Sequence, residues 1–186
     1  GVEILSQAEA GIHADVVEDG ATFEENALIK ATEIAEAARK MPEYQDAVVL
    51  ADDSGLEIDC LNKEPGIYSA RYMGEDTSYD IKNQALLDQL EGVEDEKRTA
   101  RFVCAIAAAF PDGSTEVVRG TMEGIIGHEI AGENGFGYDP IFYLPEYGCT
   151  SAQLAPEKKN ELSHRGEGLR KMRTILEDRQ SGLDRQ

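Results

Sequence analysis

The stretch RTARFVCAIAAAFPDGSTEVVRGTMEGIIG, residues 98–127, predicts the centre of the fold. Two long runs, residues 98–110 and 115–127, flank the sequence PDGS. Proline presets the backbone angle φ and glycine accepts a positive one, so Pro-Asp-Gly is typical of a turn. Two long strand-like runs joined by a short turn are typical of a β-hairpin. We therefore expect an antiparallel pair of long strands here.

Helical periodicity appears well before this hairpin. Thr22 and Glu25 form a capping box, which predicts the start of a helix ending near Arg39. Apolar side chains then recur at helical spacing. The predicted buried stripe consists of Phe23, Ala27, Ala31, Ile34 and Ala38. Asn26 and Lys30 lie one turn apart beside it.

Two further helices are predicted on either side of the hairpin. One follows Thr77, whose capping partner is Asp80, and another begins near Ser163. The side chains expected to face the core are Tyr79, Leu86, Leu87 and Leu90 in the first, and Leu169, Met172 and Leu176 in the second. Strands and helices mix without strict alternation, which predicts an α/β or α+β domain around a mixed sheet. Without internal repeats or a linker, we expect residues 1–186 to form one domain.

Composition excludes several classes of function. The chain has 37 acidic and 18 basic residues, a net charge of -19, which would repel a nucleic-acid polymer or an anionic membrane surface. The three cysteines, Cys60, Cys104 and Cys149, have neither zinc-site nor disulfide-framework spacing, so we expect a reducing, cytoplasmic setting. No apolar run reaches about 18 residues, so no membrane span is expected.

The segment VVLADDSGLEIDC, residues 48–60, places two carboxylates side by side. Ala47–Ala51 and Leu56–Leu61 are each typical of a strand, which puts the acids at a strand end. Successive side chains of an extended chain point to opposite faces, so we expect only one of Asp52 and Asp53 to face a site. The alternative interpretation is a turn, capped by Asp and Ser with glycine at positive φ.

The segment ENGFGYDP, residues 133–140, predicts a glycine-rich loop that brings Phe136, Tyr138 and Asp139 together. Glycine lets the backbone approach a ligand, and an aromatic ring offers a stacking face to a planar base. The alternative is a hairpin whose two aromatic rings pack in the core. The pattern alone does not favour either.

The segment EKKNELSHRGEGLRKMR, residues 157–173, is basic within an acidic chain. Ser163 can cap the last helix, which leaves Lys159, His164 and Arg165 near a helix N-terminus, where an anion is favoured. A solvated helix face is the simpler interpretation of Arg170, Lys171 and Arg173. Acids for a cation, bases for phosphates and a ring for a base together indicate a nucleotide site with Mg²⁺.

Six segments carry a resemblance to a known family. They are EDGATFEENALIKA (18–31), LADDSGLEID (50–59), PGIYSARYMGE (65–75), RTARF (98–102), GENGFGYDPIF (132–142) and KNELSHRG (159–166). In this order they resemble the inosine triphosphate pyrophosphatase family, over nearly the whole chain. The resemblance implies an elongated, two-lobed α/β fold around a long mixed sheet, usually in a homodimer. It also implies Mg²⁺-dependent hydrolysis of the purine nucleoside triphosphates ITP, dITP and XTP to the monophosphate and pyrophosphate.

The resemblance also assigns roles to residues. It places a general base and Mg²⁺ position on Asp53 and a second metal position on Glu18. Whether Asp53 takes the proton of water or only holds the metal stays open at this point. The substrate contacts that it implies are Ser54, Phe136, Gly137, Tyr138, Asp139, Lys159, His164 and Arg165. Of these, His164 and Arg165 are the candidates for donors to a 6-oxo purine.

One departure from the family pattern matters. Family members begin with a strand and a Ser/Thr-x-Asn-x-x-Lys phosphate loop, and neither precedes Gly1, so we expect upstream residues. The competing hypothesis is a non-catalytic purine nucleotide-binding protein that has lost its phosphate clamp. The presence of Asp53 and Glu18 favours catalysis. A second alternative is a pyrophosphatase for pyrimidine nucleotides.

Overall fold

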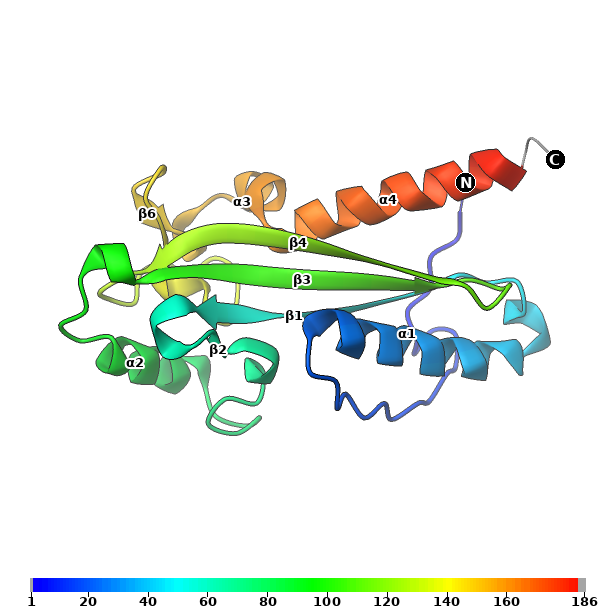
Figure 1. Ribbon diagram of the computed structural model, residues 1–186, viewed down its shortest axis with the longest axis horizontal. Helices are drawn as coiled ribbons and strands as arrows, with labels where there is room; N and C mark the ends of the chain where they lie inside the picture. Colours follow the sequence, from blue (N-terminus) through cyan, green and yellow to red (C-terminus); the bar gives the residue numbers. More distant parts are fainter. Residues whose placement is uncertain (1, 184–186) are drawn as a thin grey trace. The chain divides into compact units, whose positions relative to one another are not determined.

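The computed structural model describes residues 2–183 and confirms the α/β class (Figure 1). The helices are α1 (Phe23–Arg39), α2 (Tyr79–Gln89), α3 (Pro156–Leu162) and α4 (His164–Leu183). The strands are β1 (Val49–Ile58), β2 (Glu64–Pro65), β3 (Thr99–Ala109), β4 (Thr115–Ile126), β5 (Phe142–Leu144) and β6 (Cys149–Thr150). Within the described part of the chain, no helix has the length and apolar character needed to cross a membrane.

The strands form one sheet in the order β2-β1-β3-β4-β5-β6. The predicted hairpin is confirmed as β3 and β4, with the Phe110 N–H donating to the Ser114 carbonyl at 2.9 Å across the turn. Gly113 takes the expected positive φ of 86° in this turn. The pairings β1–β2, β4–β5 and β5–β6 are antiparallel.

The chain folds into two compact units. Unit 1 comprises residues 1–53, 105–119 and 171–186, and unit 2 comprises residues 54–104 and 120–170. Strands β1, β3 and β4 therefore contribute residues to both units. The single domain over residues 1–186 stays a prediction.

In unit 1, helix α1 begins and packs as predicted. Thr22 Oγ1 accepts from the Glu25 N–H at 3.1 Å. The return bond of the predicted capping box is displaced by one residue, because Glu25 Oε2 accepts from the Ala21 N–H. All five residues of the predicted apolar stripe are buried.

In unit 2, the start of helix α2 differs from the prediction. Ser78, not Thr77, caps the helix, with its Oγ accepting from the Ile81 N–H, while Thr77 Oγ1 donates to the Met73 carbonyl. Leu86, Leu87 and Leu90 are buried as predicted. The prediction for Tyr79 was wrong, since it is the first residue of the helix and is 37% exposed.

The C-terminal helical region contains one more helix than predicted. Helix α3 ends at Leu162, and Ser163 then caps α4 by accepting from the Gly166 N–H at 2.9 Å. The first turns of α4 lie so close to β4 that a Cβ atom on Gly120 would be 2.1 Å from the His164 carbonyl oxygen. Only glycine fits at that crossing.

The inward face predicted for this last helix is only partly correct. Met172 is buried as expected, and Leu176 is half-buried. Leu169 is 51% exposed, so its prediction was wrong. The close approach at Gly120 explains this, because it places the glycine side of the first turns, including Gly168, against the sheet.

The predicted break at the two aspartates was also wrong. Residues 49–58 form one continuous strand, β1, with Asp52 and Asp53 in its interior rather than at a strand end or in a turn. Side chains distant in the sequence satisfy its backbone. In unit 1, Lys30 Nζ donates to the Asp52 carbonyl at 2.8 Å, and in unit 2, Ser69 Oγ accepts from the Leu56 N–H at 2.9 Å.

Candidate functional site

The first cluster of predicted site residues lies in unit 1 and is acidic. Glu18, on the loop before α1, forms an ion pair with Lys30, with Oε1 and Nζ 2.8 Å apart. The same ammonium group donates to the Asp52 carbonyl. Lys30 thus ties the loop before α1 to the interior of β1.

Asp53 is the most perturbed carboxylate of this cluster. Burial raises its pKa to about 6, and the charges of Glu18 and Asp52 add to this, while a hydrogen bond with Asn26 and the charge of Lys30 oppose it. Its Oδ2 atom is buried and has no hydrogen-bond partner within the described residues. A buried carboxylate oxygen without a partner destabilises the folded protein unless a cation or a proton satisfies it.

Asn26 explains how Asp53 is oriented. This residue is 1% exposed, and its Oδ1 accepts from the Gly20 N–H at 2.8 Å. That bond leaves the Nδ2 hydrogens for the Asp53 carboxylate. A Cβ atom on Gly20 would lie 2.7 Å from Asn26 Oδ1, so glycine is needed for this contact.

The donors of this cluster are of a kind that fits Mg²⁺. No group of three or more His, Cys, Asp or Glu side chains suited to a metal ion occurs among residues 2–183. Mg²⁺ is commonly held by one or two carboxylates and completes its shell with waters and substrate phosphates. The partnerless Asp53 Oδ2 and the neighbouring Glu18 are a donor set of this kind.

The pKa of Asp53 predicts a measurable pH dependence of stability. Because the folded-state pKa lies above the ordinary value of 3.8, the folded protein binds more protons than the unfolded chain between about pH 4 and 6. Stability is therefore lost as the pH rises through this window. Asp53→Asn has no charge to bury, so we expect it to raise the Tm at pH 8 and to leave it unchanged at pH 4. Calorimetry in EDTA checks this, and equal shifts at both pH values would contradict it.

The second cluster lies in unit 2 and contains the predicted glycine-aromatic loop. The two aromatic residues have opposite environments, since Phe136 is 78% exposed and Tyr138 is buried. The Tyr138 hydroxyl donates to the Ser69 carbonyl at 2.5 Å, and burial raises its pKa. The core alternative therefore holds for Tyr138, whereas Phe136 presents its ring to solvent.

Asp139 holds this loop from inside. Its side chain is buried and accepts from the Phe136 N–H at 2.9 Å and from Ser151 Oγ at 2.6 Å. It also pairs with the ammonium group of Lys159. Gly135, with φ of 76°, leaves room for this pair, because a Cβ atom there would lie 2.8 Å from Lys159 Nζ.

The basic residues predicted at one helix start are divided between two helices. Lys159 belongs to α3, and its Nζ lies 5.1 Å from the centroid of the Phe136 ring. His164 and Arg165 form the first turn of α4. The His164 ring stacks on Phe102, with centroids 5.0 Å apart, and Arg165 is exposed. Ser54, on β1, is also exposed.

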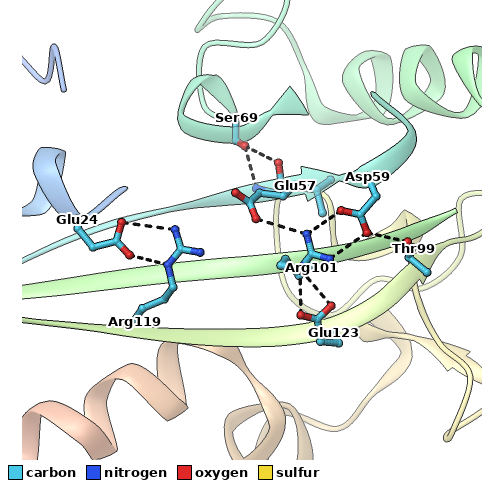
Figure 2. A network of polar contacts seen from close by, with 9 residues as sticks. Glu24, Glu57, Asp59, Ser69, Thr99, Arg101, Arg119 and Glu123 are labelled. Atoms are coloured by element: carbon cyan, nitrogen blue, oxygen red, sulfur yellow. Dashed lines mark hydrogen bonds and ion pairs between the residues drawn. The ribbon is translucent and has the colours of Figure 1, made fainter. Parts of the chain in front are cut away.

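A polar network in unit 2 accounts for Arg101, the second of the two arginines in the segment RTARF (Figure 2). Arg101 contacts Asp59 with two nitrogens, each at 2.9 Å, and also reaches Glu123 at 3.0 Å and Glu57 at 3.5 Å. Thr99 Oγ1 donates to Asp59 as well. These bonds lower the pKa of Asp59 and connect β3 with β1 and β4. A separate pair in unit 1 joins Glu24 and Arg119 at 2.6 Å.

The sequence profile of the Ham1 family matches residues 1–175. The chain belongs to the Ham1 family. A dITP/XTP pyrophosphatase from Clostridium perfringens is 47% identical over 175 residues, covering 94% of this chain and 85% of that protein. One from Geobacillus kaustophilus is 51% identical over 173 residues, covering 92% and 81%. The structure of the Staphylococcus aureus Ham1 protein aligns with a TM-score of 0.80 at 46% identity, covering 89% and 82%.

Sequence reasoning missed two contributors to the acidic cluster of this Ham1 protein. Asn26 and Lys30 were noted only for their spacing beside the apolar stripe of α1, yet both act on Asp53. The feature of the sequence that could have indicated their role is their spacing, because two polar residues four positions apart lie on one side of a helix, here next to its buried face. It did not indicate which carboxylates the pair would contact.

Proposed function

We propose that this Ham1 protein is a nucleoside triphosphate pyrophosphatase that cleanses the nucleotide pool. It hydrolyses dITP, ITP, XTP and dXTP to the nucleoside monophosphate and pyrophosphate. Relatives at 47% and 51% identity over more than nine-tenths of this chain are dITP/XTP pyrophosphatases. The observation that carries the proposal is the buried, partnerless Oδ2 of Asp53 beside Glu18 and Lys30.

Asp53 and Glu18 are the residues that would hold Mg²⁺. When bound, the ion would neutralise phosphate charge and lower the pKa of a water molecule. Lys30 orients Glu18 through their ion pair, and Asn26 orients Asp53. The partnerless oxygen of Asp53 supports this assignment, because a cation would satisfy it.

The proton of the attacking water is assigned to Asp53. In the absence of a bound metal, burial raises its pKa to about 6, which makes this carboxylate a stronger base than an ordinary aspartate and leaves it largely ionised at neutral pH. Water attacks the α-phosphorus, its proton passes to Asp53, and the bond to the bridging oxygen breaks. Pyrophosphate then leaves with the electron pair of that bond. Positioning and charge neutralisation supply most of the catalysis in such transfers.

The purine is assigned to the loop at residues 136–139. The exposed Phe136 ring sits on a backbone held by Asp139 and Tyr138, which suits a rigid stacking surface. His164 and Arg165, in the first turn of α4, are proposed to donate to the 6-oxo group. Adenine carries an amino group at this position, so the side-chain N–H groups would face further N–H groups instead of an oxygen that can accept a hydrogen bond. Ser54 and Lys159 are proposed as further substrate contacts.

The test of this function is a panel of triphosphates. Purified protein is incubated with ITP, XTP, dITP, ATP, dCTP and dUTP, with and without Mg²⁺, and the products are separated by chromatography. We expect monophosphate and pyrophosphate from the oxo purines, only with Mg²⁺. Binding of ITP without turnover would instead support a nucleotide-binding protein. Preferential cleavage of dCTP or dUTP would support the pyrimidine alternative.

A homodimer is also proposed, on the basis of the family resemblance. Sedimentation equilibrium should give twice the mass of one chain. A monomer at micromolar concentration would contradict this proposal without affecting the assigned reaction.

The base pocket yields a prediction with two variants. Stacking does not depend on the substituents of the purine ring, so Phe136→Ala should weaken the binding of every purine triphosphate alike, by about 1–3 kcal/mol. Arg165→Ala should lower kcat/KM for ITP and XTP far more than for ATP, because only the oxo purines lose a partner. Steady-state kinetics with ITP and ATP measure both effects. An unchanged ITP/ATP ratio in Arg165→Ala would move this residue from base reading to phosphate binding.

A further inference from the structure

The loop that carries Phe136 is held at almost every position around the exposed ring. On one side, the Asn134 N–H donates to the Ala152 carbonyl and its side chain to the Leu154 carbonyl. The Phe136 N–H is bound by Asp139, and Tyr138 is anchored through its hydroxyl. Between these bonds lies Gly137, whose φ of 63° is in the left-handed region. Glycine is the least restricted residue, so the Gly137 peptide needs an external contact to keep one orientation.

That contact comes from helix α2. Asn83 Nδ2 donates to the Gly137 carbonyl at 3.1 Å, across 54 residues of sequence. The helix lies close to this point of the loop, since a Cβ atom on Gly137 would be 3.6 Å from the Tyr79 ring. The Tyr79 ring also meets the Tyr138 ring edge to face, with centroids 5.2 Å apart.

Asn83 is poorly explained by stability alone. The residue is 1% exposed, and its Oδ1 atom is buried without a hydrogen-bond partner within the described residues. An unsatisfied buried carbonyl destabilises a protein, whereas an apolar side chain of the same size carries no such cost. The amide at this position therefore has a benefit that offsets the unsatisfied oxygen, and the bond to Gly137 is the contact that an apolar side chain of the same size could not make.

We propose that Asn83 is a positioning residue that fixes the Gly137 peptide and thereby the Phe136 ring. It acts through the ring and contacts neither substrate nor metal. The proposal rests on the proposed function only for its consequence, which is purine affinity. Its structural part, the rigidity of Phe136, is independent of any activity.

The kinetic test compares Asn83→Leu with Gln84→Leu. Gln84 is the adjacent, exposed amide of α2, and within the described part of the chain its side chain bonds Asp88 on the same helix, so it serves as the matched control. Loss of a pre-formed stacking surface weakens the binding of the substrate and of the transition state by the same amount. Asn83→Leu should therefore raise KM for ITP about tenfold with kcat within about twofold, whereas Gln84→Leu should change neither.

A double-mutant cycle shows whether the effect passes through the ring. In a Phe136→Ala background, Asn83→Leu should change KM by less than about twofold, because the ring that it positions is absent. A full tenfold effect in that background would overturn the proposal. If the leucine variant does not fold, Asn83→Asp replaces it, since aspartate keeps the shape but removes the donor facing Gly137.

A spectroscopic measurement separates this proposal from the proposed function. The chain contains no tryptophan, so Phe136→Trp introduces a single indole on the loop. Its fluorescence anisotropy should decay with a larger fast component when combined with Asn83→Leu than with Gln84→Leu. Equal decays would overturn the positioning role even if ITP is hydrolysed. Different decays in a protein that hydrolyses no triphosphate would support the positioning role and reject only the assigned reaction.

Discussion

Asp53→Asn should lower kcat for ITP by about 10²–10⁴-fold, the range expected when a general base is removed. The substitution keeps the shape of the side chain and its position in β1, while it removes the charge that would hold Mg²⁺ and accept a proton. The predicted rise of the Tm at pH 8 would show that the loss of activity does not come from unfolding. Single-turnover kinetics with ITP at saturating Mg²⁺ give the measurement.

Asp52→Asn is the matched control for this prediction. Asp52 is the preceding residue of the same strand, so its side chain points to the opposite face of the sheet. Its contact with Lys30 is made by the backbone carbonyl, which the substitution leaves in place. We expect a smaller loss of activity. Equal losses in the two variants would contradict the assignment of the proton to Asp53.

Arg98→Met should lower the free energy of unfolding by about 3 kcal/mol or more, a large share of the 5–15 kcal/mol typical of a domain. Arg98 is 2% exposed, and its guanidinium donates to four backbone carbonyls. These belong to Leu90 and Val93 after α2 and to Ile126 and Gly127 at the end of β4. Methionine fills a similar volume but leaves these carbonyls without a donor.

Urea denaturation monitored by circular dichroism measures this change. Arg173→Met is the control, because Arg173 is an exposed residue of α4 whose ion pair within residues 2–183 is with Glu177, one turn away. Surface pairs of this kind contribute about 0–1 kcal/mol. If Arg98→Met unfolds at the same urea concentration as the control, the bonds of Arg98 do not hold the end of α2 to the sheet.

Local patterns predicted the elements whose stabilisation is also local. The hairpin β3–β4 follows from two long strand-like runs around a Pro-Asp-Gly turn, and the structure confirms it. The buried stripe of α1 follows from 3.6-residue spacing behind a Thr22 cap, and every predicted member is buried. Spacing and capping involve neighbours in sequence, so they can be read without knowing the fold.

For the candidate site, the sequence indicated residue types but not their environments. The motifs indicated Glu18 and Asp53 for a cation and residues 136–139 for a base. They did not indicate that Tyr138 is buried while Phe136 is exposed, or that Asp139 bonds the loop itself. These differences depend on which neighbour each side chain meets, and those neighbours lie elsewhere in the chain.

The sequence by itself determined the α/β class, the long hairpin, the faces of α1 and the candidate residues of a nucleotide pyrophosphatase. Only the tertiary structure decided that β1 runs unbroken through Asp52 and Asp53, because Lys30 and Ser69 satisfy its backbone from distant positions. It also decided the pKa of Asp53 and the bond from Asn83 to Gly137. The physical reason is range: periodicity, caps and turns are set by adjacent residues, whereas burial and hydrogen-bond partners are set by segments that meet only in the folded chain.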